Sequence, residues 1–244
     1  MREALIVGGA NGIGLAIATI LAEDERFTKI HIIDRQEIDK RYFHHKFEFK
    51  YFDLRSEEYS IFDKFESIDT LIITAGFGRL SHFRDIDEQH IVDSFAVNST
   101  AVIRIIHHFY ERIAGEREFY CAVMGSIAGF MSSPLFAVYG ATKAALKVFI
   151  ESVNVELEMT GSQNRILNIS PGSIKGTAFY NGTNDLSITQ KLASDILSHL
   201  WNRDDLFIPQ YDEVFKGVLE RYHEDFRAEG RHSYEYKMQS GRVK

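Results

Sequence analysis

The sequence predicts an α/β fold in which a doubly wound parallel sheet of about seven strands carries helices on both faces. Short apolar runs alternate along the chain with segments whose apolar residues recur at helical spacing. A glycine-rich turn, residues 8–14, separates the first apolar run from the first helical pattern. The second apolar run ends in an acidic residue, Asp34, twenty residues after Gly14. These three observations are typical of a sheet that binds a ligand at the carboxyl ends of its strands.

Length and composition suit one globular domain and argue against several function classes. The chain has 244 residues, of which 45% are apolar and 26% charged, as in ordinary soluble domains. The net charge is -7, and the main body contains no block of lysine and arginine, so we expect neither a nucleic acid partner nor an anionic membrane partner. No apolar run approaches the roughly 20 residues of a membrane-spanning helix. The single Cys121 indicates a reducing compartment, and we expect a cytoplasmic protein.

The first strand, residues 4–7, is a continuous apolar run that predicts burial on both faces of the sheet. Glycines follow it at once and lead into a helix, which brings backbone N–H groups and a helix N-terminus to one point. That point suits the pyrophosphate of a dinucleotide, and the flanking strand and helix favour this Rossmann-type site over an ordinary glycine turn. The residues expected to contact the cofactor here are Gly8, Gly9, Asn11, Gly12, Ile13 and Gly14.

The second strand, residues 29–33, ends at Asp34. An acid at this place accepts hydrogen bonds from the adenosine ribose hydroxyls and repels a 2′-phosphate, so NAD is favoured over NADP. Arg35 can instead pair with that phosphate, which leaves NADP open.

Two further strands bring more residues to the same edge. Alternating aromatic and polar residues predict a third strand over residues 42–52, and an apolar run predicts a fourth over residues 70–74. The cofactor contacts expected at their ends are Asp53, Leu54, Ala75 and Gly76. We interpret His44 and His45 as exposed strand residues and expect no metal site, because no partner falls at metal-ligand spacing nearby.

Helical periodicity predicts long helices over residues 88–114 and 139–159 and another over 189–201. Further strands are expected over residues 121–124, 165–170 and 206–208. Residues 173–188 lack periodicity, which is typical of a lid over a site. We expect one domain over residues 1–210 and an amphipathic C-terminal helix and tail over residues 211–244. The last fifteen residues, 230–244, are expected to be loosely ordered.

Tyr139 and Lys143 lie four residues apart and therefore share one face of the helix that Tyr139 opens. A nearby ammonium favours the phenolate, so we expect Lys143 to lower the pKa of Tyr139. Such a tyrosine can transfer a proton to or from a carbonyl or alcohol. Taken alone, this spacing also fits an ordinary amphipathic helix.

With Ser126 thirteen residues before Tyr139, the chain resembles the short-chain dehydrogenase/reductase family over about residues 4–177. Residues 7–14 match its glycine turn, with Val7 in place of a threonine, and residues 73–76 stand where the family usually has Asn-Asn-Ala-Gly. Gly125 replaces the first of a common serine pair. The residues that match the catalytic tetrad are Asn98, Ser126, Tyr139 and Lys143, and those that match the nicotinamide loop are Pro171, Gly172, Ile174 and Thr177.

The resemblance implies an NAD(P)-dependent oxidoreductase that interconverts a carbonyl and a secondary alcohol. It implies that Tyr139 is the general acid or base and that Lys143 lowers its pKa and binds the nicotinamide ribose. Ser126 then hydrogen-bonds the substrate oxygen, and Asn98 holds a water that relays protons. A homodimer or homotetramer built on the two long helices is also implied. The alternatives are a non-catalytic cofactor-binding sensor or scaffold and, less favoured, a sugar-nucleotide epimerase.

The resemblance also implies a small-molecule substrate with a carbonyl or alcohol group. We expect apolar walls around it, from Leu135, Phe136, Phe179 and Tyr180.

Overall fold

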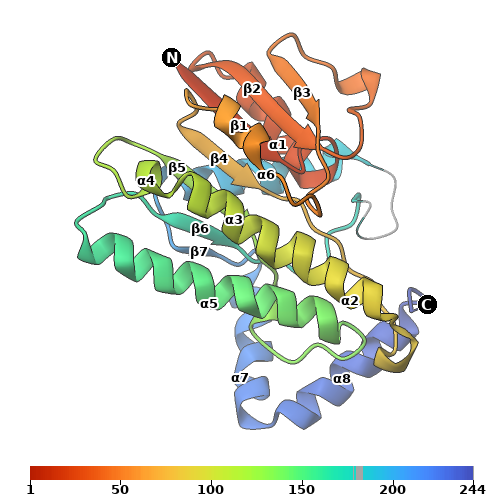
Figure 1. Cartoon of the computed structure of the whole chain (residues 1–244). Coiled ribbons are helices and arrows are strands. Elements are labelled where there is room, and N and C mark those ends of the chain that lie inside the picture. The colour runs from red at the N-terminus through yellow and green to blue at the C-terminus, as the bar shows by residue number, and fades with distance from the viewer. Residues whose placement is uncertain (178, 180–183, 244) are drawn as a thin grey trace.

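The computed structural model describes residues 1–177, 179 and 184–243. In this part of the chain the strands form one seven-stranded parallel sheet in the order β3-β2-β1-β4-β5-β6-β7 (Figure 1). The strands are β1 (Arg2–Val7), β2 (Phe27–Asp34), β3 (Phe47–Tyr51), β4 (Thr70–Ile73), β5 (Tyr120–Met124), β6 (Ile166–Ile169) and β7 (Leu206–Phe207). The predicted α/β fold with its parallel sheet is confirmed.

Helices cover both faces of the sheet, which explains why its strands are apolar runs. On one face lie α1 (Gly12–Glu23) and α6 (Leu186–Trp201), whose buried side chains pack against those of β1 and β2. The other face carries α2 (Glu88–Phe95), α3 (Ala101–His108), α4 (Tyr110–Ile113) and α5 (Ala137–Met159). Short 3-10 turns occur at η1 (Lys40–Tyr42), η2 (Ser60–Lys64), η3 (Phe83–Asp85) and η5 (Ile127–Gly129).

The strand order reverses between β1 and β4, which pair with each other although β2 and β3 separate them in the sequence. At such a switch point the connections leave in opposite directions and open a crevice beyond the carboxyl ends of the strands. The glycine turn after β1 and the small residues after β4 meet at this crevice.

Two predicted elements differ from their expected extents. The third strand begins only at Phe47, because Lys40–Tyr42 forms a 3-10 turn instead of a strand. The carboxylate of Asp39 caps this turn by accepting from the N–H of Arg41 at 3.0 Å. The long helix expected over residues 88–114 contains a π-helical turn, Ala96–Thr100, and is interrupted at Phe109. The π-helical turn contains Asn98.

The C-terminal part contains two helices instead of one helix and a loose tail. A π-helical turn, Tyr211–Phe215, leads into α7 (Lys216–Glu224), and α8 (Phe226–Gln239) follows directly. The carboxylate of Asp225 caps α8 by accepting from the N–H groups of Arg227 at 2.9 Å and Ala228 at 3.0 Å. The expectation of loose order is therefore wrong for residues 230–239, because this cap and tertiary contacts stabilise a helix there.

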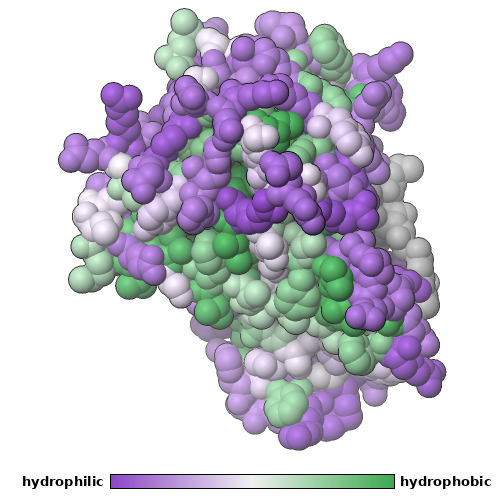
Figure 2. All heavy atoms as spheres, in the orientation of Figure 1, coloured by the Kyte–Doolittle hydropathy of each residue, from purple (hydrophilic) through white to green (hydrophobic). Residues whose placement is uncertain are grey.

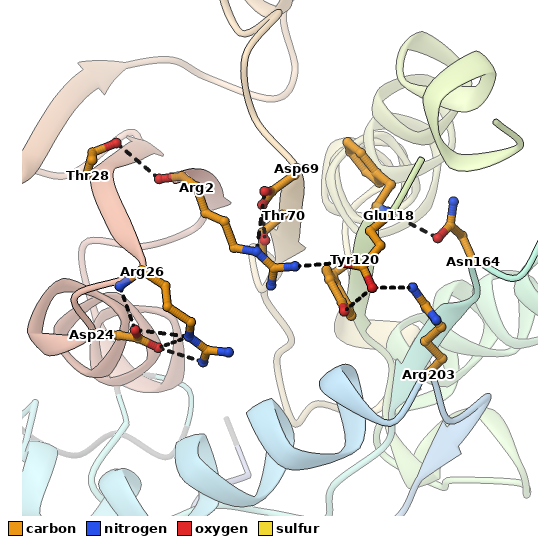
Figure 3. A network of polar contacts seen from close by, with 11 residues as sticks. Arg2, Asp24, Arg26, Thr28, Asp69, Thr70, Glu118, Tyr120, Asn164 and Arg203 are labelled. Atoms are coloured by element: carbon orange, nitrogen blue, oxygen red, sulfur yellow. Dashed lines mark hydrogen bonds and ion pairs between the residues drawn. The ribbon is translucent and has the colours of Figure 1, made fainter. Parts of the chain in front are cut away.

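The end of the sheet away from the crevice, where the strands begin, contains a network of charged and polar side chains (Figure 3). The Arg2 guanidinium donates to Glu118 at 2.9 Å and lies 3.5 Å from Asp69, and Glu118 also accepts from Arg203 at 3.0 Å. These contacts join the starts of β1, β4 and β5 to the segment before β7. The network lies at the amino ends of the strands, whereas the crevice lies beyond their carboxyl ends.

Apolar side chains gather on the outer face formed by α5 and the neighbouring α2 (Figure 2). On α5, Val148, Val155 and Met159 are exposed, as are Val92 and Phe95 at the end of α2. Among the described residues, no helix combines the length and the apolar character needed to cross a membrane.

Candidate active site

A cavity of about 860 Å³ lies at the carboxyl ends of β1, β4, β5 and β6. The glycine turn, the ends of the strands and the start of α5 form one side, and α7 and α8 form the other. The C-terminal helices thus close the crevice that the strand order opens. Ligand sites in open parallel sheets occupy this position.

The glycine turn packs so closely that side chains cannot replace its glycines. Gly8 has a φ of +89°, and a Cβ there would lie 2.4 Å from the backbone nitrogen of Ala75. A Cβ at Gly14 would lie 2.3 Å from the carbonyl oxygen of Gly8. The hydroxyl of Thr74, which stands where the family usually has an asparagine, donates to the same carbonyl at 3.0 Å. Close backbone packing and the Thr74 hydroxyl therefore hold the turn against the end of β4.

The N-terminus of α1 faces the cavity and offers a donor to an oxygen ligand. The N–H of Gly12 donates to the side-chain oxygen of Asn184 at 2.8 Å, so an oxygen acceptor fits at this point. Asn11, which precedes the helix, makes no side-chain cap and instead donates to Gln36 at 2.8 Å. The donor set, the positive end of the helix and the glycine cradle fit the pyrophosphate of a dinucleotide.

Asp34 lies at the end of β2 with both carboxylate oxygens held by backbone N–H groups. One oxygen accepts from Ala10 at 3.1 Å and the other from Gln36 at 3.1 Å. Asp53, at the end of β3, is bonded to Arg55, which lowers the pKa of Asp53 to about 2, with a smaller contribution from the charge of Arg35. The carboxylate of Asp34 is thus fixed by backbone groups at the edge of the cavity, which Asp34 lines.

Tyr139 lies in the first turn of α5 and faces the cavity between two phenylalanines. The centre of its ring is 5.0 Å from that of Phe136 and 5.2 Å from that of Phe179. Burial raises the pKa of Tyr139 to about 12, and a hydrogen bond with Ser126 lowers it in part. The predicted lowering by Lys143 is wrong, because the Lys143 ammonium lies 5.7 Å from the centre of the ring and donates to the carbonyl of Met124 at 2.7 Å.

Ser126 and Lys143 complete the cluster predicted from the sequence. Ser126 follows β5, and its side chain accepts from the N–H of Ala128 at 3.2 Å. Lys143 is buried, and a Cβ at Gly76 would lie 3.4 Å from its Nζ. Ser126, Tyr139 and Lys143 all line the cavity. The structure therefore brings a hydroxyl, a phenol and an ammonium to one wall.

Asn98 lies behind this wall and holds the loop after β4. Its amide accepts from the N–H of Phe77 at 2.9 Å and donates to the carbonyl of Phe77 at 2.8 Å. It also donates to the hydroxyl of Thr142, one residue before Lys143, at 3.2 Å. Asn98 lies in the π-helical turn, a local irregularity that is frequent at functional sites. Asn98 thus connects the cofactor side of the cavity to α5, and the water-holding role expected for it stays a prediction.

The loop after β6 joins the two halves of the predicted cofactor site. Thr177 donates to the carbonyl of Ile174 at 2.8 Å, and its methyl group would lie 3.5 Å from a Cβ at Gly12. A Cβ at Gly172 would lie 2.7 Å from the ring of Phe215, so this loop also touches the C-terminal segment.

Most residues predicted for the site line the cavity. They are Gly8, Asn11, Gly12, Ile13, Gly14, Asp34, Arg35, Asp53, Leu54, Ala75, Gly76, Ser126, Tyr139, Lys143, Pro171, Gly172, Ile174 and Thr177. Gly9 and Asn98 do not line it, since Gly9 packs against the side chains of Ile6 and Ile32. Of the four expected apolar wall residues, Phe136 and Phe179 line the cavity, Leu135 packs behind Phe136, and Tyr180 lies outside the described residues.

Sequence reasoning missed the contribution of α7 and α8 to the cavity. The residues concerned are Val218, Arg221, Glu229, His232, Ser233, Tyr236 and Lys237. The amphipathic pattern predicts a helix there but not the surface against which the helix packs. The basic residues near the C-terminus suggest an exposed tail.

The sequence profile of the short chain dehydrogenase family matches residues 2–186. The chain belongs to this family. A short-chain type dehydrogenase/reductase of Sinorhizobium fredii, itself uncharacterized, is 28% identical over 195 residues, which cover 79% of this chain and 77% of the relative. A short-chain dehydrogenase of Pyricularia oryzae is 27% identical over 241 residues, covering 89% and 80% of the two chains.

Solved structures of short-chain dehydrogenases share this fold. A short-chain dehydrogenase/reductase of Burkholderia phymatum in complex with NAD has a TM-score of 0.77 at 16% identity and covers 93% of this chain and 94% of its own. A short chain dehydrogenase of Burkholderia cenocepacia in complex with NADP has a TM-score of 0.76 at 19% identity, with 96% and 99% covered. These two proteins hold different cofactors, so the fold alone leaves the choice between NAD and NADP open.

Gly125 departs from the serine that commonly precedes the catalytic serine in short chain dehydrogenases, and the structure gives a reason. A Cβ at Gly125 would lie 2.2 Å from the side-chain oxygen of Asn168 and 2.6 Å from the hydroxyl of Ser170. These two buried side chains of the β6 region are bonded to each other at 2.8 Å. The space that a serine side chain needs is therefore filled from the neighbouring strand.

The buried Lys143 makes stability depend on pH in a short chain dehydrogenase of this kind. Burial lowers the pKa of Lys143 from 10.5 to about 8. Between these values the unfolded chain binds more protons than the folded protein, so the contribution of Lys143 to the free energy of unfolding rises with pH. We compare the wild-type protein with a Lys143→Met variant, which lacks this group. From about pH 8 to pH 10.5, we expect the free energy of unfolding of the wild-type protein to rise by up to about 3 kcal/mol relative to that of the variant.

Urea unfolding of both proteins across this range measures the effect. The comparison with the variant is needed because burial also lowers the pKa of Lys237 to about 8, and that group titrates in both proteins. A stability difference that stays constant across the range would contradict the burial of a charged Lys143.

Proposed function

We propose that this short chain dehydrogenase interconverts a carbonyl and a secondary alcohol with NAD as the hydride carrier. The observation that carries the proposal is the meeting of Ser126, Tyr139 and Lys143 on one wall of a cavity whose other end is the glycine turn. A sensor or scaffold without turnover needs no such wall. Turnover of a panel of ketones with NADH, in the wild-type protein and in a Tyr139→Phe variant, tests the proposal.

The nicotinamide, when bound, supplies or accepts the hydride at the carbonyl carbon. Tyr139 donates the proton to the developing alkoxide in reduction. With a pKa of about 12, the phenol is neutral at pH 7 and gives its proton to the more basic alkoxide. Ser126 donates a hydrogen bond to the same oxygen, an interaction that strengthens as negative charge develops there.

Lys143 and Asn98 hold this arrangement. The ammonium of Lys143 lies beside Gly76 and keeps a positive charge at the end of the cavity where the nicotinamide ribose is placed by the family resemblance. Its pKa of about 8 leaves it mostly protonated at pH 7. Asn98, through Phe77 and Thr142, positions the loop and the helix that carry the reacting groups. We therefore treat Asn98 as a positioning residue.

Asp34 supports NAD over NADP. Its carboxylate is fixed by the N–H groups of Ala10 and Gln36 at the edge of the cavity, and a 2′-phosphate beside it would meet a like charge. The guanidinium of Arg35 lies close enough to Asp53 to help lower its pKa, so part of its charge is already engaged.

An Asp34→Asn variant should therefore change cofactor choice. We expect the ratio of NADH affinity to NADPH affinity to fall about 10- to 100-fold, because a charge-assisted hydrogen bond is lost and a repulsion is removed. An Arg35→Ala variant is the matched control and should weaken NADPH binding more than NADH binding. Fluorescence titration with the two reduced cofactors measures both. An unchanged ratio in Asp34→Asn would contradict the assignment.

The exposed apolar side chains of α5 support association with a second copy of the chain. Val148, Val155 and Met159 are each more than half exposed, at 60%, 58% and 81%. Exposed apolar groups gathered on one face are typical of an interface. We propose a homodimer or homotetramer that uses this face.

A further inference from the structure

Lys237 projects from α8 into the same cavity as Tyr139 and Ser126. Its ammonium donates to the hydroxyl of Ser133 at 2.7 Å and to the carbonyl of Pro134 at 2.9 Å. An ammonium has three donors, so one remains after these two bonds. In Figure 1, α8 passes beneath the N-terminal end of α5, the end that carries Tyr139. Among the described residues no acceptor takes this third donor, and Lys237 lines the cavity.

Only neutral groups accept hydrogen bonds from Lys237 in the part of the chain that the structure describes. Glu229 lies two turns earlier on α8, but its carboxylate accepts from Arg221 at 2.7 Å. Burial and the like charge of Arg242 lower the pKa of Lys237 to about 8, which leaves it mostly charged at pH 7. A partly buried cation without a carboxylate is costly unless an anion joins it.

The distance from Lys237 to the reacting groups is short. The Lys237 ammonium lies 5.6 Å from the centre of the Phe136 ring, and that centre lies 5.0 Å from the centre of the Tyr139 ring. One aromatic ring therefore separates the cation from the proton donor. The wall between them is apolar, since Phe136 and Phe179 line it.

We propose that Lys237 binds an anionic group, a carboxylate or a phosphate, on a substrate whose reacting carbonyl lies several bonds away across an apolar stretch. This inference rests on the proposed oxidoreductase function and specifies its substrate class. The apolar wall packs on the middle of the substrate, Tyr139 and Ser126 bind the carbonyl oxygen, and the free donor of Lys237 binds the anion. Lys237 is then a specificity-determining residue that lies outside the region matched by the family profile.

Matched ketones test the proposal, namely para-acetylbenzoate, para-acetylphenyl phosphate and the neutral para-acetylbenzamide. We expect the wild-type protein to reduce at least one anionic ketone with a kcat/KM at least tenfold above that for the amide. A Lys237→Met variant should lower kcat/KM for that ketone about 10- to 100-fold, the loss typical of a charge-assisted hydrogen bond, while the amide changes by less than about threefold. Which anionic ketone responds distinguishes a carboxylate from a phosphate.

Two controls separate recognition from a structural role. An Arg231→Met variant removes an exposed cation of the same helix that does not line the cavity, and it should leave all three values unchanged. A Lys237→Arg variant should retain part of the preference for the anion. An equal loss on all three ketones in Lys237→Met would mean that Lys237 only holds α8 on the loop, and this would overturn the proposal. A wild-type protein that reduces the amide as well as the anions would overturn it too.

Failure of the underlying function gives a different result. If the wild-type protein reduces no ketone with NADH or NADPH, the oxidoreductase proposal loses its support, and calorimetry with the unreactive para-ethylbenzoate, para-ethylphenyl phosphate and para-ethylbenzamide still tests Lys237. Tighter binding of an anion than of the amide, lost in Lys237→Met, would support an anion site. Equal binding of the anions and the amide, or no binding at all, would overturn it.

Discussion

Replacing Tyr139 with Phe is expected to lower the turnover of ketones with NADH by about 10²- to 10⁴-fold, the usual contribution of a positioned general acid. In the proposed mechanism the phenol donates the proton to the developing alkoxide, and Phe keeps the ring that packs between Phe136 and Phe179. Cofactor affinity should change little, because the glycine turn and Asp34 are untouched. Steady-state kinetics and NADH titration of the same preparations measure the two effects.

A matched control for this change is Tyr51→Phe, which removes the hydroxyl of an exposed tyrosine that does not line the cavity. It should retain full turnover. Thermal unfolding of Tyr139→Phe should stay within about 1 kcal/mol of the wild-type stability, since only one hydroxyl is removed. Unchanged turnover in Tyr139→Phe would remove Tyr139 from the reaction and with it the main support for the proposed function.

Restoring the serine common in the family, Gly125→Ser, is expected to destabilise this protein by about 1–3 kcal/mol. The new side chain would meet Asn168 and Ser170, whose polar atoms lie 2.2 Å and 2.6 Å from the position of its Cβ. Both residues are buried and bonded to each other, so neither moves aside without losing that bond. Urea unfolding measures the change.

A double-mutant cycle shows whether this clash is the cause. In an Asn168→Ala background, Gly125→Ser should destabilise the protein by less than it does in the wild-type background, because the nearest obstructing atom is gone. If Gly125→Ser is equally destabilising in both backgrounds, Asn168 does not account for the glycine. A gain in stability in the wild-type background would contradict the argument altogether.

Much of the site was accessible to sequence reasoning because local rules govern it. A strand, a glycine turn and a helix in succession place backbone donors at one point whatever follows, and the spacing of Tyr139 and Lys143 places both on one helix face. The approximate extents of most strands follow from their apolar runs. The start of the third strand did not follow, because the aromatic residues that suggested it also fit the 3-10 turn at Lys40–Tyr42.

The sequence by itself determined the α/β class, the glycine turn, and the identity and order of Ser126, Tyr139 and Lys143. Only the tertiary structure decided that Tyr139 has a raised pKa, because burial beside Phe136 and Phe179 disfavours the phenolate. It also decided that the Lys143 ammonium donates to the carbonyl of Met124. Only the tertiary structure brought α8 and Lys237 to the cavity. Amphipathic spacing specifies which side chains of a helix are buried, but not the surface that buries them, because that surface is built from distant parts of the chain.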